Sequence, residues 1–73
     1  MITIDFHGDR LEAAVAEIHQ HVAAARMARE KREMQIIAGH GIINWKVREI
    51  LREYGLTPRL MVGNDGVILC EVE

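Results

Sequence analysis

Met-Gln-Ile-Ile-Ala-Gly-His-Gly, at residues 34–41, predicts a strand that ends in a glycine turn. The apolar run is short and rich in isoleucine, which favours a strand over a helix. Beyond Gly41, apolar residues recur at helical spacing as far as Tyr54, and Gly55 supplies a stop. We therefore expect a strand, a glycine turn and a helix in this order.

The amino-terminal stretch repeats this arrangement. Residues 2–6 alternate between apolar and polar side chains, as a half-buried strand does, and Gly8 follows. Asp9 has the spacing of a helix N-cap with Glu12 at the third helical position. A stripe of apolar residues then predicts a helix from about 10 to 28.

The remaining residues predict two more strands. Arg59 to Val62 and Val67 to Val72 are rich in β-branched and apolar residues, and Gly63-Asn64-Asp65-Gly66 between them has the composition of a hairpin turn. The order βαβαββ predicts an α/β protein of the α+β two-layer sandwich type, with two helices on one face of a four-stranded mixed sheet. A right-handed crossover places the carboxyl ends of the first two strands, and hence both glycine turns, at one edge. The open sheet face is expected to be partly polar. It should carry Thr3, Asp5 and His7 from the first strand, and Gln35 and the apolar Ile37 from the second.

Composition limits the classes of protein that fit. A chain of 73 residues builds one domain, residues 1–73, with a thin core. The single Cys70, the lack of a leader pattern and the absence of a long apolar run favour a cytoplasmic protein without a membrane span. The formal net charge of −2 means that any nucleic-acid site depends on local charge.

The Gly39-His40-Gly41 turn is a candidate phosphate site. Backbone N–H groups at a helix start attract anions, and glycines allow close approach. The same glycines also suit a plain tight turn. Gly8 ends the first strand in the same way, and His40 lies where it could contact a phosphate, although it could equally be an exposed loop residue.

Asp5 and His7 are candidates for proton transfer. They are two residues apart on a strand, so both project from one face, and the carboxylate can orient or charge the imidazole. A purely structural role for the histidine is the alternative.

Trp45 is expected on the solvent side of the second helix, in line with Arg48 and Arg52. An exposed aromatic beside arginines can stack on a nucleotide base while the arginines hold phosphate, and Lys46 adds to this basic group. A protein-contact anchor is equally compatible with the pattern. A second basic group, at Arg26 to Arg32, also suits a solvated helix end.

Two motifs resemble those of the small MutS-related (Smr) domain family. Ile4-Asp5-Phe6-His7-Gly8 is similar to its Leu-Asp-Leu-His-Gly pattern. Ala38-Gly39-His40-Gly41 is similar to its His-Gly-x-Gly turn, with alanine at the leading position. Ile43 to Val47 corresponds to a family Leu-Arg-x-x-Val segment, in which the basic position is replaced and Lys46 and Arg48 lie nearby.

The resemblance covers nearly the whole chain and implies a fold like the carboxyl-terminal domain of bacterial translation initiation factor three, with sheet order 1-2-4-3. It implies binding to DNA or RNA and endonuclease activity, nicking DNA or cleaving RNA, with a divalent cation as a candidate cofactor. The alanine at position 38 keeps open a non-catalytic adaptor, bound to nucleic acid, to a ribosome or within a larger protein. A protein-interaction module using the open face and Trp45 is a third reading.

Overall fold

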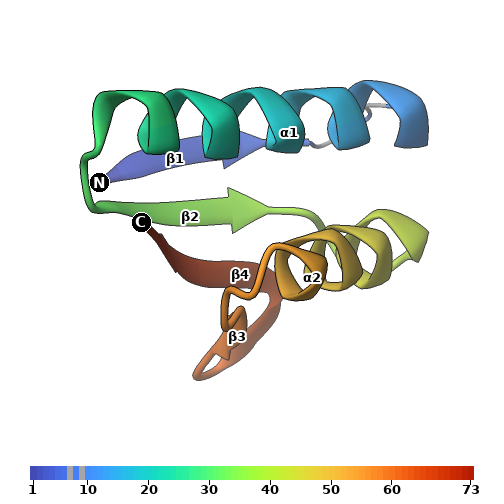
Figure 1. Cartoon of the computed structure of the whole chain (residues 1–73). Helices are drawn as coiled ribbons and strands as arrows, with labels where there is room; N and C mark the ends of the chain where they lie inside the picture. The colour runs from blue at the N-terminus through green and yellow to red at the C-terminus, as the bar shows by residue number, and fades with distance from the viewer. Residues whose placement is uncertain (7, 9) are drawn as a thin grey trace.

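The computed structural model describes residues 1–6, 8 and 10–73. The chain forms four strands and two helices, with the helices packed beside the sheet (Figure 1). In chain order the elements are β1 (Ile2–Asp5), α1 (Leu11–Ala28), β2 (Arg32–Ile37), α2 (Ile42–Glu53), β3 (Arg59–Met61) and β4 (Asn64–Val72). The predicted order βαβαββ is confirmed.

The sheet is mixed, with strand order β1-β2-β4-β3. Strand β1 pairs in parallel with β2, whereas β4 is antiparallel to both of its neighbours. The expected topology is therefore confirmed. Because β1 and β2 are parallel, their carboxyl ends lie at one edge, where the chain turns into each helix.

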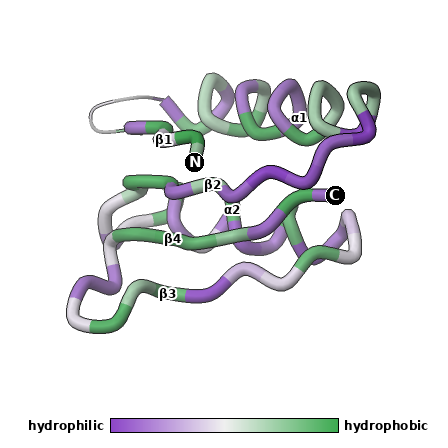
Figure 2. The backbone as a smooth tube through the Cα atoms, turned by 90° about the vertical axis from the view of Figure 1, so that its left-hand side faces the viewer, coloured by the Kyte–Doolittle hydropathy of each residue, from purple (hydrophilic) through white to green (hydrophobic). Residues whose placement is uncertain are grey.

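One face of the sheet carries the core. Residues at alternate strand positions are buried, including Ile4 in β1, Ile36 in β2 and Ile68 in β4, and the last two are register partners. Both helices contribute to the same cluster, through Ile18 of α1 and Leu51 of α2 for example. In Figure 2 strand β4 passes in front of α2, so the other face of the sheet is turned towards the viewer. On that face Thr3 and Asp5 are exposed and Gln35 and Ile37 half-buried, as expected.

The hairpin differs from the prediction. Its turn is at Val62 and Gly63, and β4 already begins at Asn64. The register shifts between Leu60 and Met61, because Leu60 pairs with Ile68 while Met61 pairs with Asn64. Residues 65–67 are therefore an irregular segment within β4, which we call the β4 bulge. The composition that suggested a turn here instead belongs to a bulge, another place where glycine and asparagine are common.

The start of α1 also differs. Its N-cap is Arg10, which makes no side-chain capping bond, so the helix begins one residue later than a cap at Asp9 would place it. Asp9 itself lies outside the described residues.

Arg29 ends α1 in a conformation that normally favours glycine. Its φ of 54° is left-handed, and Glu30 N–H bonds to the Ala25 carbonyl as in a Schellman motif. Helix α2 ends in the same way with Gly55 at φ 82°. Arginine is thus strained where glycine would not be.

We expect Arg29→Gly to stabilise the fold by about 0.5–1 kcal/mol, since relief of this strain exceeds the extra entropy of glycine in the unfolded chain. For a domain of this size the melting temperature should rise by about 2–8 °C. Ala28→Gly, one residue earlier in regular helix, is the control and should lower it. A melting temperature unchanged or lowered by Arg29→Gly would contradict the assignment of strain.

Candidate functional site

The two glycine turns meet at one edge of the sheet. Asp5 is the register partner of Ile37, and Phe6 N–H bonds to the Ile37 carbonyl at 2.9 Å. Gly8, at φ 78°, follows β1 at the same edge that Gly39 occupies after β2. Neighbouring strands are only about 4.8 Å apart, so Asp5 and the Gly39 turn belong to one surface. His7, the other half of the predicted acid/base pair, lies outside the described residues.

The backbone of the Gly39 turn is fixed by β4. Both Ala38 N–H and Gly39 N–H donate to the carbonyl of Gly66, at 2.9 and 3.0 Å. Gly39 has a φ of 70°, which permits this bend. Its N–H is therefore not open to a phosphate. Among the described residues, the N–H groups of His40 and Gly41 have no partner, so the predicted anion contact is narrowed to these two.

Asn44 holds the same turn from the helix side. Its side-chain amide Nδ2 donates to the Gly39 carbonyl at 2.7 Å and to the Asp65 carbonyl at 2.9 Å. The residue is 4% exposed, and it is the one buried polar residue in the part of the chain that is described. Asn44 is not among the site residues predicted from the sequence. A polar residue near an apolar helical stripe, just after a glycine turn, was the available signal.

The start of α2 is open to an anion. Its N-cap is Gly41, with no side-chain cap, and no acidic residue occupies its first turn. Helix α1, in contrast, has Glu12 in its first turn. Free N–H groups and the positive end of the helix dipole therefore remain unopposed by a carboxylate within α2. Of the two helix starts at this edge, α2 is the better anion site.

His40 is exposed and lies over Gly66. A Cβ added to Gly66 would be 3.2 Å from His40 Cε1 and 3.4 Å from Gly39 Cα. A side chain at position 66 would therefore crowd the His40 ring, which would have to move by a few tenths of an ångström. In Figure 2 the β3–β4 turn and the carboxyl end of β2 lie at the same end of the sheet, in agreement with these contacts.

Trp45 is exposed, as predicted, with 54% of its surface accessible, and Ile42 one turn earlier is 63% exposed. Lys46 Nζ lies 6.0 Å from the Trp45 ring centroid and forms an ion pair with Glu49 at 2.8 Å. The hydrogen bond and charge of Glu49 raise the pKa of Lys46. Its positive charge is therefore partly compensated before any ligand arrives.

Arg48 and Arg52, which the sequence places in line with Trp45, differ in their exposure. Arg52 is exposed, but Arg48 is half-buried. The Arg48 Nε is buried and has no hydrogen-bond partner among the described residues. Arg48 follows Asn44 by four residues, so it lies on that flank of the helix and not in the middle of the solvent face.

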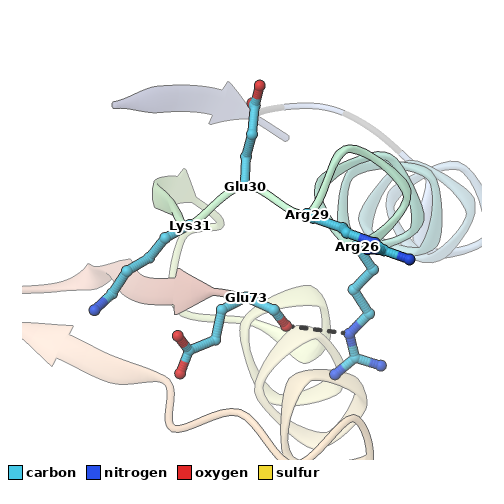
Figure 3. Close-up of a pocket in the computed structure, with 5 residues that line it drawn as sticks. All are labelled: Arg26, Arg29, Glu30, Lys31 and Glu73. Carbon is cyan, nitrogen blue, oxygen red and sulfur yellow. Dashed lines mark hydrogen bonds between the residues drawn. The ribbon is translucent and has the colours of Figure 1, made fainter.

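The basic group of residues 26–32 lies at the opposite end of the molecule, around a cavity of about 530 Å³ (Figure 3). Arg26 Nη2 donates to the Tyr54 carbonyl at 2.8 Å, and Arg26 Nε to the Glu73 carbonyl at 3.4 Å. Lys31 pairs with Glu71 at 2.7 Å. These contacts favour a structural role for this group. The cavity is lined by Arg26, Arg29, Glu30, Lys31 and Glu73, none of them a predicted site residue.

A second cavity, of about 430 Å³, is at the same end and also contains no predicted site residue. Within residues 1–6, 8 and 10–73, no three His, Cys, Asp or Glu side chains gather as metal ligands would. Among the described residues, no helix is long and apolar enough to cross a membrane.

Comparisons with protein-family models, curated proteins and solved structures found no match.

Proposed function

We propose that this chain is a nucleic-acid-binding domain that holds a backbone phosphate at the His40 and Gly41 amides. One observation supports this most: an uncapped helix start whose His40 and Gly41 amides have no partner among the described residues, next to a turn that β4 and Asn44 hold in place. Such a start offers N–H donors and a favourable dipole to an anion. Trp45, four residues after Gly41, is then placed to stack on a base of the same strand.

Phosphodiester cleavage is the activity we propose at this edge, as the Smr resemblance implies. His7 accepts a proton from the attacking oxygen, and Asp5 orients the imidazole. The oxygen of a water molecule bonds to phosphorus as the bond to the leaving oxygen breaks, and the leaving oxygen takes up a proton from solvent. The His40 and Gly41 amides stabilise the oxygen that gains negative charge in the transition state.

Binding and cleavage are tested together on labelled single-stranded, duplex and branched DNA and on structured RNA. Each substrate is assayed with and without Mg²⁺ and Mn²⁺. Binding that weakens steeply as salt is raised would support phosphate contacts. Absence of binding to every substrate at low salt would refute the proposal, whereas binding without cleavage would leave an adaptor function.

Gly41→Val is expected to hinder the approach of a phosphate to the His40 and Gly41 amides without disturbing the fold. Gly41 has a φ of −94°, which any residue adopts, and a Cβ there would meet no atom within 4 Å. The fold should therefore tolerate the change, while the added side chain stands beside the amides that hold the phosphate. We expect oligonucleotide affinity to fall about tenfold, which is the effect of losing roughly 1.4 kcal/mol.

Gly39→Val is the matched variant at the other end of the turn. Its left-handed φ makes any side chain strained, so we expect lower thermal stability there in addition to weaker binding. Normal binding by folded Gly41→Val would show that the turn is purely structural.

A protein-interaction module is the second candidate, favoured by the adjacent exposed Ile42 and Trp45 and by the Lys46–Glu49 pair. An apolar pair with compensated charge suits a protein partner better than a phosphate backbone. The two functions differ in their dependence on Ile42: a base stacked on Trp45 does not need Ile42, whereas a protein partner would contact both. Oligonucleotide binding unchanged by Ile42→Ala would favour the nucleic-acid function.

A further inference from the structure

We infer that Asn44 is a positioning residue for the phosphate turn, an inference that rests on the proposed function. Asn44 touches no ligand in this scheme. Its role is to hold the Gly39 turn in a fixed geometry, and so to position the His40 and Gly41 N–H groups that follow it. We assign this role because the buried side-chain amide of Asn44 donates hydrogen bonds to two backbone carbonyls.

The two acceptors belong to segments far apart in the chain. The Gly39 carbonyl precedes the open amides directly, and the Asp65 carbonyl lies in the β4 bulge. Because both bonds come from one nitrogen, Nδ2, the distance between the turn and the bulge is set by Asn44. A side chain without N–H donors would leave both carbonyls without this partner, and would remove the two bonds that join the exposed turn and bulge to the buried Asn44.

The β4 bulge completes the arrangement from the other side. The Gly66 carbonyl accepts both Ala38 N–H and Gly39 N–H, while Gly66 N–H is bound by Asn64 Oδ1 at 3.1 Å. The turn is therefore held before and after Gly39, by backbone bonds on one side and by Asn44 on the other. The amides of His40 and Gly41 lie one and two residues after Gly39. A small shift of the backbone at Gly39 therefore changes the position of both amides.

Asn44→Asp keeps the shape and removes both donors, but it also places a carboxylate in the first turn of α2, so it is always compared with the uncharged Asn44→Ala. At neutral pH its carboxylate faces two carbonyl oxygens, so we expect the turn to shift and affinity for a single-stranded oligonucleotide to fall about tenfold. At acid pH the carboxyl group is protonated and can donate one hydrogen bond. Part of the lost affinity should then return, relative to the unmodified protein at the same pH.

Val47→Ala is the control for lost stability. Val47 is fully buried in the same helix, and its side chain has no hydrogen-bonding group. All variants are compared at a temperature where each is folded. The second measurement is amide NMR of residues 38–41 and 64–66, which reports the turn without any ligand.

The inference is supported if Asn44→Asp and Asn44→Ala displace these amide signals and weaken binding while Val47→Ala does neither. It is overturned if folded Asn44→Asp binds and gives signals like the unmodified protein, or if Val47→Ala loses as much affinity. If the unmodified protein binds no oligonucleotide, the proposed function fails, and the NMR signals alone decide: displaced signals support the positioning role, and unchanged signals refute it.

Discussion

His7→Ala is expected to abolish cleavage, with a loss of about 10²–10⁴-fold in rate, the usual contribution of a general acid or base. The imidazole would accept the proton of the attacking oxygen, and alanine cannot. Phe6, the preceding residue, is buried and carries the packing of this strand end, so the variant should keep its core. Single-turnover cleavage of a labelled substrate at saturating protein measures the loss without interference from binding.

Asp5→Asn is the companion variant. It should reduce the rate less than His7→Ala, because it alters the orientation and charge of the base without removing it. Oligonucleotide affinity should change little in either variant, since neither residue belongs to the amides that hold the phosphate. Full cleavage by folded His7→Ala would exclude His7 as the base.

Trp45→Ala should weaken binding of single-stranded oligonucleotide by about 1–3 kcal/mol, the range for stacking of one base on an aromatic ring. More than half of the Trp45 surface is accessible, so its removal leaves the core intact and the melting temperature nearly constant. A fluorescence titration measures the contact directly, because a stacked base quenches tryptophan emission. Raising the salt concentration should reduce this quenching as the phosphate contacts are screened.

Arg52→Ala tests how much the positive charge near the Trp45 ring contributes to oligonucleotide binding. Arg52 is exposed, so we expect a smaller loss of affinity and a shallower salt dependence than in the unmodified protein. Blue-shifted emission from the free protein, or unfolding on Trp45→Ala, would show that Trp45 belongs to the core.

The sequence predicted the elements well because their patterns are local. The alternation at residues 2–6 and the stripe along α1 are each contained in one window of the chain, so periodicity alone locates them. Exposure of Trp45 followed from its helical angle in the same way. The sheet order depended on the handedness of the crossover and on the Smr resemblance.

The contacts that shape the site could not be predicted in this way, because each joins residues far apart in the chain. Asn44 bonds to Asp65, and Gly39 to Gly66, only because β4 inserts beside β2. The bulge at residues 65–67 was interpreted as a turn, since both use the same residues. The helical angle placed Arg48 in line with Trp45, but it could not predict that Arg48 is half-buried, because burial beside a helical stripe depends on what packs there.

The carbonyl of Gly66 makes assembly of the site depend on a late step of folding. Strand β4 lies between β2 and β3 in the sheet but follows them both in the sequence. On a ribosome, Ala38 and Gly39 therefore emerge well before the acceptor of their N–H groups exists, and a loop of more than 20 residues must close to supply it. Once formed, these two amides lie next to the central β2–β4 ladder and should exchange with solvent only when the whole domain unfolds. The neighbouring His40 and Gly41 amides, without such partners among the described residues, should exchange faster by orders of magnitude, so that the most protected and the most reactive backbone of this molecule lie side by side.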